Sequence, residues 1–192
     1  MNTVAIIQAR MNSTRLPGKV LMDIKGKPML QHIVDRARDS NVDNVVVATN
    51  LEGSPAINQY CHKHGIPTSS GHDSDLIDRF IFTSRHYKAD VIVRLWGDCP
   101  LVLPQNINEL IRAFNSMVFP YIYHNRHAGI FTLTQLNGWD DEIMDPDTRE
   151  NFHLYAMNNE VSLTMGLSLS FKDSVDTLED LEFIRGIYEL LP

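Results

Sequence analysis

Three cations lie close together in a polar segment that follows the first apolar run of the chain. Arg10, Arg15 and Lys19 stand within residues 8–19 (QARMNSTRLPGK), directly after the strand-like run at residues 4–9. Such cations, together with the backbone amides of a curled loop, can converge on one polyanion. A solvated loop without function is the alternative, but it does not explain why the cations stand beside a strand end and a Pro-Gly turn. The pattern therefore indicates a site for phosphates.

This loop differs from two common phosphate-binding motifs. Val20 stands where a Walker A loop has Ser or Thr after Gly-Lys, and no GxGxxG fingerprint follows the strand.

A carboxylate follows another strand-like run. Asp98 comes directly after residues 90–96, in a turn shaped by Gly97 and Pro100. An aspartate in a turn can simply cap the next element. Beside a phosphate site it can instead hold Mg²⁺, which commonly takes one or two protein carboxylates and leaves the remaining positions to phosphate and water. Because ligands gather at the carboxyl ends of strands in open α/β sheets, we expect Asp98 to face the cationic loop.

Three further positions have competing interpretations. Asp176 or Thr177 can cap the last helix of the chain, whose first turn carries further acidic residues. Arg94 stands on a strand, where it can pair with an acidic neighbour. Cys99 has no identifiable base near it in the sequence, so a buried thiol is a better interpretation than a nucleophile. Neither cysteine has the spacing of a disulfide framework or a zinc site.

The elements that must position these residues alternate along the chain. Strands are expected at residues 4–9, 44–49, 66–69 and 90–96, and later at 121–124, 130–136, 161–165 and 167–171. Helices are expected after residues 27–28, from 54, from about 75, and at 104–117, 147–157 and 178–191. In the second helix Ser54 would be the N-cap and Ala56 would face inward. Continuous apolar strands between amphipathic helices predict a three-layer α/β/α sandwich with a mainly parallel sheet.

The composition indicates a folded protein. The chain has 192 residues, 43% of them hydrophobic, and a formal net charge of −7. That charge disfavours duplex nucleic acid as a partner, because proteins that bind it usually carry a basic face. The first apolar run is too short for a signal peptide, and no run approaches the roughly 20 apolar residues of a membrane span. We expect a cytoplasmic protein with no nucleic-acid or membrane partner.

Six segments resemble one protein family. The chain resembles the cytidylyltransferases of the spore coat polysaccharide biosynthesis type, which are similar to the CMP-sugar synthetases that activate 3-deoxy-manno-octulosonate and acylneuraminate. The segments that carry this resemblance are residues 6–21 (IIQARMNSTRLPGKVL), 26–30 (GKPML), 46–49 (VVAT), 70–79 (SGHDSDLIDR), 93–101 (VRLWGDCPL) and 175–182 (VDTLEDLE).

The resemblance implies a nucleotide-diphospho-sugar transferase-like fold and a reaction. CMP would pass from CTP to a sugar or sugar acid with release of pyrophosphate, in polysaccharide biosynthesis and with Mg²⁺ as cofactor. Asp98 and Asp176 would hold the metal, and Arg10, Lys19 and Asp98 would be catalytic. The residues expected to bind the nucleotide are Gln8, Ala9, Arg10, Ser13, Arg15, Lys19, Ser70, Gly71, Asp75, Arg79 and Gly97. For residues 70–79, capping of the following helix by Asp73 or Ser74 is an equal alternative.

We expect one domain over residues 1–192. Its segment at approximately 119–165 would be an abbreviated acceptor or dimerisation region, and a homodimer stays open. Three other functions also stay open. One is a sugar-1-phosphate nucleotidyltransferase with another base preference, and another is a glycosyltransferase of related fold. The third is a catalytically weak nucleotide-binding or partner protein.

Overall fold

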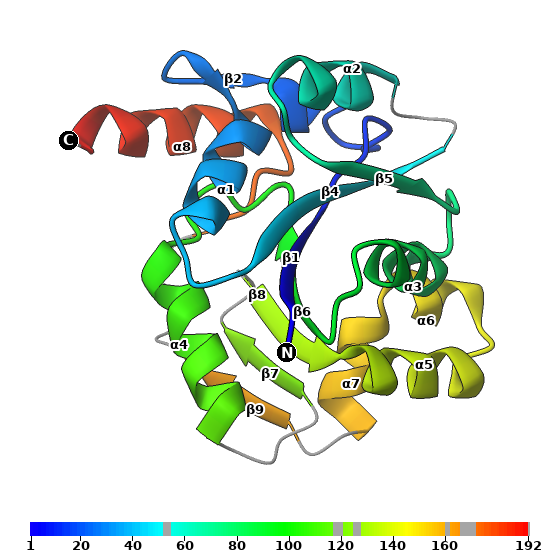
Figure 1. Ribbon diagram of the computed structural model, residues 1–192. Coiled ribbons are helices and arrows are strands. Elements are labelled where there is room, and N and C mark those ends of the chain that lie inside the picture. The colour runs from blue at the N-terminus through cyan, green and yellow to red at the C-terminus, as the bar shows by residue number, and fades with distance from the viewer. Residues whose placement is uncertain (52–54, 117–120, 125–127, 160–161, 166–171, 192) are drawn as a thin grey trace.

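Seven strands form one sheet through the middle of the molecule (Figure 1). The computed structural model describes residues 1–51, 55–116, 121–124, 128–159, 162–165 and 172–191. Within this part of the chain the strand order is β5-β4-β1-β6-β8-β7-β9. Neighbouring strands are parallel except where β8 is a partner, because β8 runs antiparallel to both β6 and β7. The mainly parallel sheet expected from the sequence is therefore confirmed.

The central strands bring two loops together. β1 (Thr3–Gln8) lies between β4 (Asn44–Asn50) and β6 (Val91–Trp96), and it is parallel to both. These strands are almost continuously apolar because helices cover both of their faces. The register places Gln8 opposite Trp96, so the loops that follow β1 and β6 begin side by side.

The remaining strands extend the sheet to its two edges. β5 (Thr68–Gly71) pairs with β4 at one edge. On the other side, β8 (Ala128–Thr132) pairs with β6 and with β7 (Tyr121–His124). β9 (Ser162–Met165) then pairs in parallel with β7 and forms that edge.

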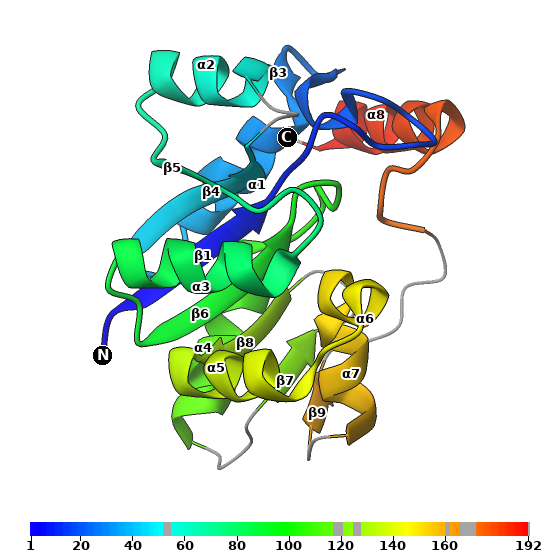
Figure 2. The same ribbon diagram turned by 90° about the vertical axis from the view of Figure 1, so that its right-hand side faces the viewer.

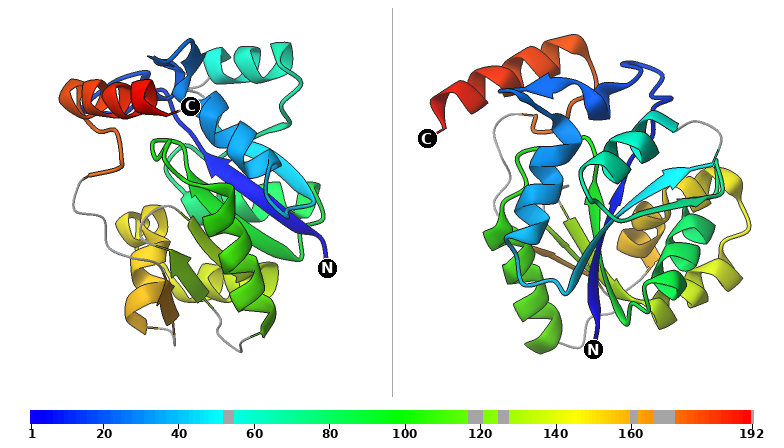
Figure 3. Two further views of the ribbon diagram at one scale, coloured as in Figure 1. Left: turned by 90° about the vertical axis from the view of Figure 1, so that its left-hand side faces the viewer. Right: turned by 45° about the horizontal axis from the view of Figure 1, so that its top comes forward.

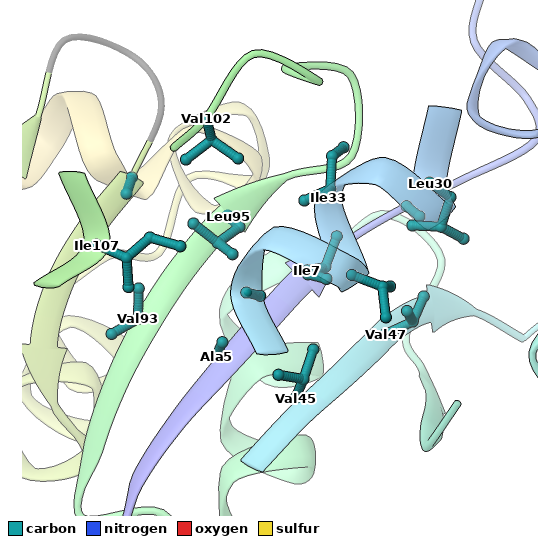
Figure 4. Close-up of a cluster of buried hydrophobic side chains, with 14 of the residues drawn as sticks. Ala5, Ile7, Leu30, Ile33, Val45, Val47, Val93, Leu95, Val102 and Ile107 are labelled. Atoms are coloured by element: carbon teal, nitrogen blue, oxygen red, sulfur yellow. The ribbon is translucent and has the colours of Figure 1, made fainter. Parts of the chain in front are cut away.

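Three helices cover one face of the sheet. They are α1 (Met29–Arg38), α2 (Pro55–Lys63) and α4 (Pro104–Ser116). Figure 4 shows side chains of α1 and α4 meeting those of the central strands. The labelled members of this cluster are Ala5, Ile7, Leu30, Ile33, Val45, Val47, Val93, Leu95, Val102 and Ile107.

Helices from two parts of the chain cover the other face (Figure 2). α3 (Leu76–His86) and α5 (Leu133–Glu142) pack against each other, and α6 (Pro146–Glu150) and α7 (Phe152–Asn159) follow beside them. Their core is rich in aromatic rings, which bury large areas and contact one another edge-on or tilted. The rings are Phe80, Tyr121, Phe131, Trp139 and Phe152.

A third, smaller apolar cluster lies at one end of the molecule. The short helix η1 (Lys19–Leu21) leads into the hairpin of β2 (Asp23–Ile24) and β3 (Lys27–Pro28), and α8 (Leu178–Leu190) packs beside that hairpin (Figure 3). The buried members of the cluster are Ile24, Met29, Val175, Leu181, Ile184 and Tyr188. No helix in the described part of the chain has the length and apolar character needed to cross a membrane.

Several boundaries differ from the sequence-based expectation. The strand expected at residues 130–136 is wrong beyond Thr132, because the Thr132 hydroxyl accepts a hydrogen bond from the Gln135 backbone N–H and begins α5. The single helix expected at 147–157 is two helices, α6 and α7, which Asn151 separates at φ −117° and ψ 32°. The short strand expected at 66–69 lies at β5, two residues later.

Capping and orientation differ at three more positions. Asp75, and neither Asp73 nor Ser74, caps α3, since its carboxylate accepts from the backbone N–H of Asp78. Ala56 is exposed on α2, so its inward orientation was a wrong expectation. The Ser54 cap and the strand expected at 167–171 lie outside the described residues.

Thr177 begins α8 with a capping box. Its hydroxyl accepts from the Asp180 N–H at 3.2 Å, and the Asp180 carboxylate accepts from the Thr177 N–H at 2.8 Å. Replacing Thr177 with Ala should lower the free energy of unfolding by about 1 kcal/mol, which lowers the Tm of a chain of this size by about 2–4 °C. Thermal unfolding followed by circular dichroism measures this. Thr177→Ser keeps the hydroxyl and is the control, and equal Tm values for the two variants would contradict the cap.

Candidate active site

A cavity of about 390 Å³ opens at the carboxyl ends of β1 and β6. Its walls come from the loop after β1, the turn after β6, the beginning of α3, the junction of α6 and α7, and the segment before α8. The residues that line it are Gln8, Ala9, Arg10, Ser13, Thr14, Arg15, Lys19, Val20, Asp73, Ser74, Leu76, Arg79, Arg94, Trp96, Gly97, Asp98, Glu150, Asn151, His153 and Asp176. Ten of the predicted site residues are among them.

The loop after β1 is curled by local backbone hydrogen bonds. The Gly18 N–H donates to the Met11 carbonyl at 2.8 Å, and Gly18 adopts a φ of 74°, a left-handed conformation that favours glycine. The backbone N–H of Leu21 then donates to the Gly18 carbonyl and closes the short helix η1. This curl turns the chain back so that Lys19, ten residues beyond the end of the strand run, faces the same cavity as Arg10.

Two of the loop cations are exposed and form ion pairs across the cavity. Arg10 Nη1 lies 2.5 Å from Glu150 Oε1, and Arg15 Nη2 lies 2.9 Å from Asp176 Oδ1. The Arg10 and Arg15 side chains are 47% and 65% exposed. An exposed pair such as Arg10–Glu150 contributes only about 0–1 kcal/mol, so a polyphosphate can take the place of Glu150 at little cost.

Lys19 is buried, and its ammonium group has three hydrogen-bond partners in the site. Its Nζ donates to Asp98 Oδ2 at 2.7 Å, to the Val175 carbonyl at 2.5 Å and to Asp176 Oδ1 at 3.2 Å. Lys19 is only 7% exposed, whereas the Asp98 and Asp176 side chains are 27% and 17% exposed. Two carboxylates that are far apart in sequence therefore already converge on one positive group.

Asp98 is positioned by a close approach of backbones. The Gly97 N–H donates to the Gln8 carbonyl at 2.9 Å, and a Cβ at Gly97 would collide with that carbonyl oxygen. Glycine is thus required where the turn after β6 crosses the end of β1. The Asp98 carbonyl in turn accepts from the Val175 N–H at 2.8 Å, which ties the segment before α8 to this turn.

Asp176 is free of the capping role that the sequence left open, because Thr177 is the N-cap of α8. Burial disfavours its charged form, but hydrogen bonds from Lys172 and Lys19 outweigh burial and hold the pKa of Asp176 below its ordinary value. The Asp176 backbone N–H also donates to Asp180 Oδ2 at 2.9 Å. The capping box of α8 therefore helps to orient this ionised carboxylate toward Lys19.

Three predicted nucleotide-binding residues do not line this cavity. Asp75 caps α3 and pairs with Arg149 at 2.6 Å, and Ser70 accepts a hydrogen bond from Asn58. Gly71 lies against α3, where a Cβ would come within 3.1 Å of Arg79 Cα. Arg79 does line the cavity, but its Nε and Nη2 donate to the carbonyls of His72 and Asp73 and so hold that turn together.

One interpretation of the sequence was that Arg94 pairs with an acidic residue. The structure instead places Arg94 against aromatic rings and Gln8. It is 1% exposed, its Nε donates to Gln8 Oε1 at 2.8 Å, and its Nη1 has no hydrogen-bond partner among the described residues. Its guanidinium lies 4.3 Å from the ring centre of Trp96 and 4.5 Å from that of Phe152. Burial lowers the pKa of Arg94 to about 10.

Sequence reasoning did not single out several lining residues. Trp96, Thr14, Glu150 and His153 all face the cavity. Trp96 could have been found from its place at the strand end immediately before Gly97 and Asp98, whereas nothing local marks Glu150. Burial raises the pKa of the Cys99 thiol well above its ordinary value, which agrees with a buried thiol and argues against a nucleophile.

A mainly parallel sheet with a cationic loop after its central strand and a carboxylate after the neighbouring strand defines an α/β protein of the nucleotidyltransferase-like class. Residues 4–132 match the family model described as cytidylyltransferase. The chain therefore belongs to the cytidylyltransferase family.

Individual relatives agree with this assignment. The chain is 30% identical to the spore coat polysaccharide biosynthesis protein SpsF of Bacillus subtilis over 96% of this chain and 85% of that protein. It is 41% identical to a 3-deoxy-manno-octulosonate cytidylyltransferase of Trichlorobacter lovleyi over 59% of this chain, but it spans only 45% of that relative's length. A solved cytidylyltransferase of Leptospira borgpetersenii superposes with a TM-score of 0.89 at 27% identity, covering all of this chain and 88% of the other.

Proposed function

We propose that this protein transfers CMP from CTP to a hydroxyl of a sugar or sugar acid and releases pyrophosphate, in the biosynthesis of a surface polysaccharide or glycoconjugate. The observation that carries the proposal is the meeting of three loop cations with Asp98 and Asp176 in one cavity, in a chain of the cytidylyltransferase family. The cytoplasmic location and the abbreviated region at 119–165 stay predictions.

The loop cations would bind the triphosphate. Arg10 and Arg15 exchange their carboxylate partners for phosphate oxygens, and Lys19 contributes a buried ammonium group at the inner wall. Positioning and charge neutralisation are the main protein contributions to such transfers, since little covalent work falls to side chains. The acceptor oxygen forms a bond to the α-phosphorus as the bond to the pyrophosphate oxygen breaks, and the hydroxyl proton passes to water.

The donor set fits a magnesium ion. Asp98 and Asp176 both approach the same Lys19 Nζ, so their oxygens lie close together, and Mg²⁺ commonly binds one or two carboxylates together with substrate phosphates. These two residues would hold Mg²⁺, which would supply charge neutralisation at the phosphate oxygens. The ammonium group of Lys19 would then contact both the two carboxylates and the phosphates of the nucleotide.

The local charge predicts that metal and nucleotide bind together. The two carboxylates of the site are paired with Lys19, Arg15 and Lys172, so cations already outnumber them before any ligand arrives. We expect Mg²⁺ alone to leave the Tm unchanged. CTP with Mg²⁺ at about 100 times its dissociation constant should stabilise the fold by about 2.7 kcal/mol. Thermal-shift titrations of Mg²⁺, CTP and both together measure this.

A pyrophosphate-release assay over four nucleoside triphosphates and a panel of sugars tests the reaction itself. Release with CTP and a free sugar or sugar acid supports the proposal. Release only with sugar 1-phosphates or with another base would make the protein a different nucleotidyltransferase. Tight CTP binding without release from any acceptor would favour a nucleotide-binding protein of the same fold.

A further inference from the structure

Arg94 is a buried cation to which the proposed reaction assigns no role. It is 1% exposed, and no carboxylate of the described residues forms an ion pair with it. Burial lowers the pKa of Arg94 only to about 10, so the side chain is positively charged at neutral pH. A charge that is buried without a counter-charge is costly, and apolar residues of similar volume often replace such groups without loss of stability. The charge at this position therefore indicates a role other than stability.

Three aromatic rings hold the guanidinium in one place. It lies 4.3 Å from the ring centre of Trp96 on β6, 4.5 Å from that of Phe152 on α7 and 5.9 Å from that of Phe80 on α3. Such cation–π contacts are strongest where water is excluded. The guanidinium Nη1 has no partner among the described residues, and the hydrogen bond that the group does make is from Nε to Gln8. The rings therefore direct Nε at the side chain of Gln8.

This hydrogen bond decides which way the Gln8 amide faces. A guanidinium only donates, so it must meet the amide oxygen, Oε1, at 2.8 Å. The NH₂ group of the amide then lies on the other side. Gln8 is half-buried and lines the first cavity, and its Nε2 has no hydrogen-bond partner within the described part of the chain. Gln8 therefore presents a donor, and no acceptor, to a ligand in that cavity.

The backbone places this donor beside the reacting centre. Gln8 ends β1 opposite Trp96, and its carbonyl accepts from the N–H of Gly97, the residue before Asp98. The loop cations begin two residues later, at Arg10. The Gln8 side chain thus stands between the carboxylate proposed to hold the metal and the loop proposed to bind the triphosphate. A phosphate oxygen is the acceptor that such a donor would meet there.

We propose that Gln8 Nε2 donates to an oxygen of the α-phosphate, and that Arg94 is the positioning residue that holds the amide in this donating orientation. An unrestrained glutamine amide can rotate and present Oε1, which would repel a phosphate oxygen. Arg94 removes that orientation, so the donor is in place before the reaction begins. This inference rests on the proposed function, because the α-phosphate belongs to the nucleotide of that reaction.

Gln8→Glu separates chemistry from structure. Glutamate keeps an acceptor oxygen for Arg94 and supplies the missing counter-charge, so the Tm should be equal or higher. It also loses the NH₂ group and turns a carboxylate oxygen toward the phosphate, so kcat for pyrophosphate release should fall by at least about 10²-fold. Gln59→Glu, at an exposed position on α2, is the matched control and should keep kcat. A folded Gln8→Glu protein with normal kcat would overturn the role of Gln8.

Arg94→Met tests whether Arg94 acts through Gln8. Methionine retains an unbranched apolar side chain between the rings but donates no hydrogen bond, so the amide can turn. We expect kcat to fall by about 10- to 100-fold, the equivalent of one hydrogen bond to a charged group, while the KM for CTP changes by less than about threefold. The double variant Gln8→Leu/Arg94→Met should be no slower than Gln8→Leu alone, because the two residues share one effect.

The outcomes distinguish this inference from the proposed function. Additive losses in the double variant, or a higher KM for CTP with unchanged kcat, would overturn the assignment and leave the proposed function standing. A higher KM alone would indicate a ground-state contact, such as one to the ribose or the base, instead of one to the reacting phosphate. Absence of pyrophosphate release by the unmodified protein with every acceptor would overturn the proposed function and this inference with it.

Discussion

Replacing Asp98 with Asn should reduce kcat for pyrophosphate release by about 10²- to 10³-fold, the usual cost of removing one preorganised electrostatic group. Asn keeps the size of the side chain, and its carbonyl oxygen can still accept from Lys19, so the fold should remain intact. What it removes is the negative charge that would hold Mg²⁺ at the α-phosphate. Steady-state kinetics with a pyrophosphate-coupled assay measures the loss.

Binding separates this effect from a general defect. CTP affinity without metal should change little, because Asp98 would act on the nucleotide through Mg²⁺. Asp141→Asn, at an exposed position on α5, is the matched control and should react like the unmodified protein. Normal pyrophosphate release by the Asp98 variant would show that the metal assignment is wrong.

Replacing Lys19 with Met should affect both stability and activity. The substitution leaves Asp98 and Asp176 facing each other without their shared cation, and breaking a buried ion pair costs about 3–5 kcal/mol. Because both carboxylates are partly exposed, we expect the lower end, about 3 kcal/mol, which is a fall in Tm of about 6–12 °C. Pyrophosphate release should be lost as well, since the buried ammonium group no longer faces the phosphates.

A double variant distinguishes the two losses. Adding Asp98→Asn to Lys19→Met removes the carboxylate that loses its ion pair with Lys19, whereas Asp176 still pairs with Arg15 and Lys172, so part of the stability should return while activity stays absent. Residues that share one ion pair are non-additive in this way, and a double-mutant cycle measures the coupling. Lys63→Met, at an exposed position on α2, is the control. Strictly additive unfolding free energies would contradict the role of Lys19 as a shared partner.

The convergence of Lys19 and Asp98 could be predicted because it depends on one general rule. Strands with continuous apolar runs must be buried and mainly parallel, and the loops at their carboxyl ends then meet at one edge. The approach of Asp176 follows no such rule. It depends on the hydrogen bond from the Val175 N–H to the Asp98 carbonyl, which no local pattern announces, so only the family resemblance pointed to it.

Local patterns failed where propensity and tertiary context disagree. Ile130, Phe131, Leu133 and Leu136 resemble one long strand, yet the hydroxyl of Thr132 ends the strand and begins a helix. The contacts of Arg94 could not be predicted either, because the position of an arginine on a strand does not indicate which aromatic rings will pack against it. Besides Trp96, its guanidinium contacts Phe152 of α7, which lies 58 residues farther along the chain.

The contacts of Lys19 also bear on how the chain folds. Lys19 meets Asp98 across 79 residues and Asp176 across 157 residues. Closing loops of this length costs conformational entropy before the contact repays it, and such distant pairings slow folding. The reactive centre thus cannot exist in a partly folded chain that has only its local helices and hairpins. It forms only when the segment of Lys19 meets the segments of Asp98 and Asp176, so the site is assembled late, once the whole sheet and α8 are in place.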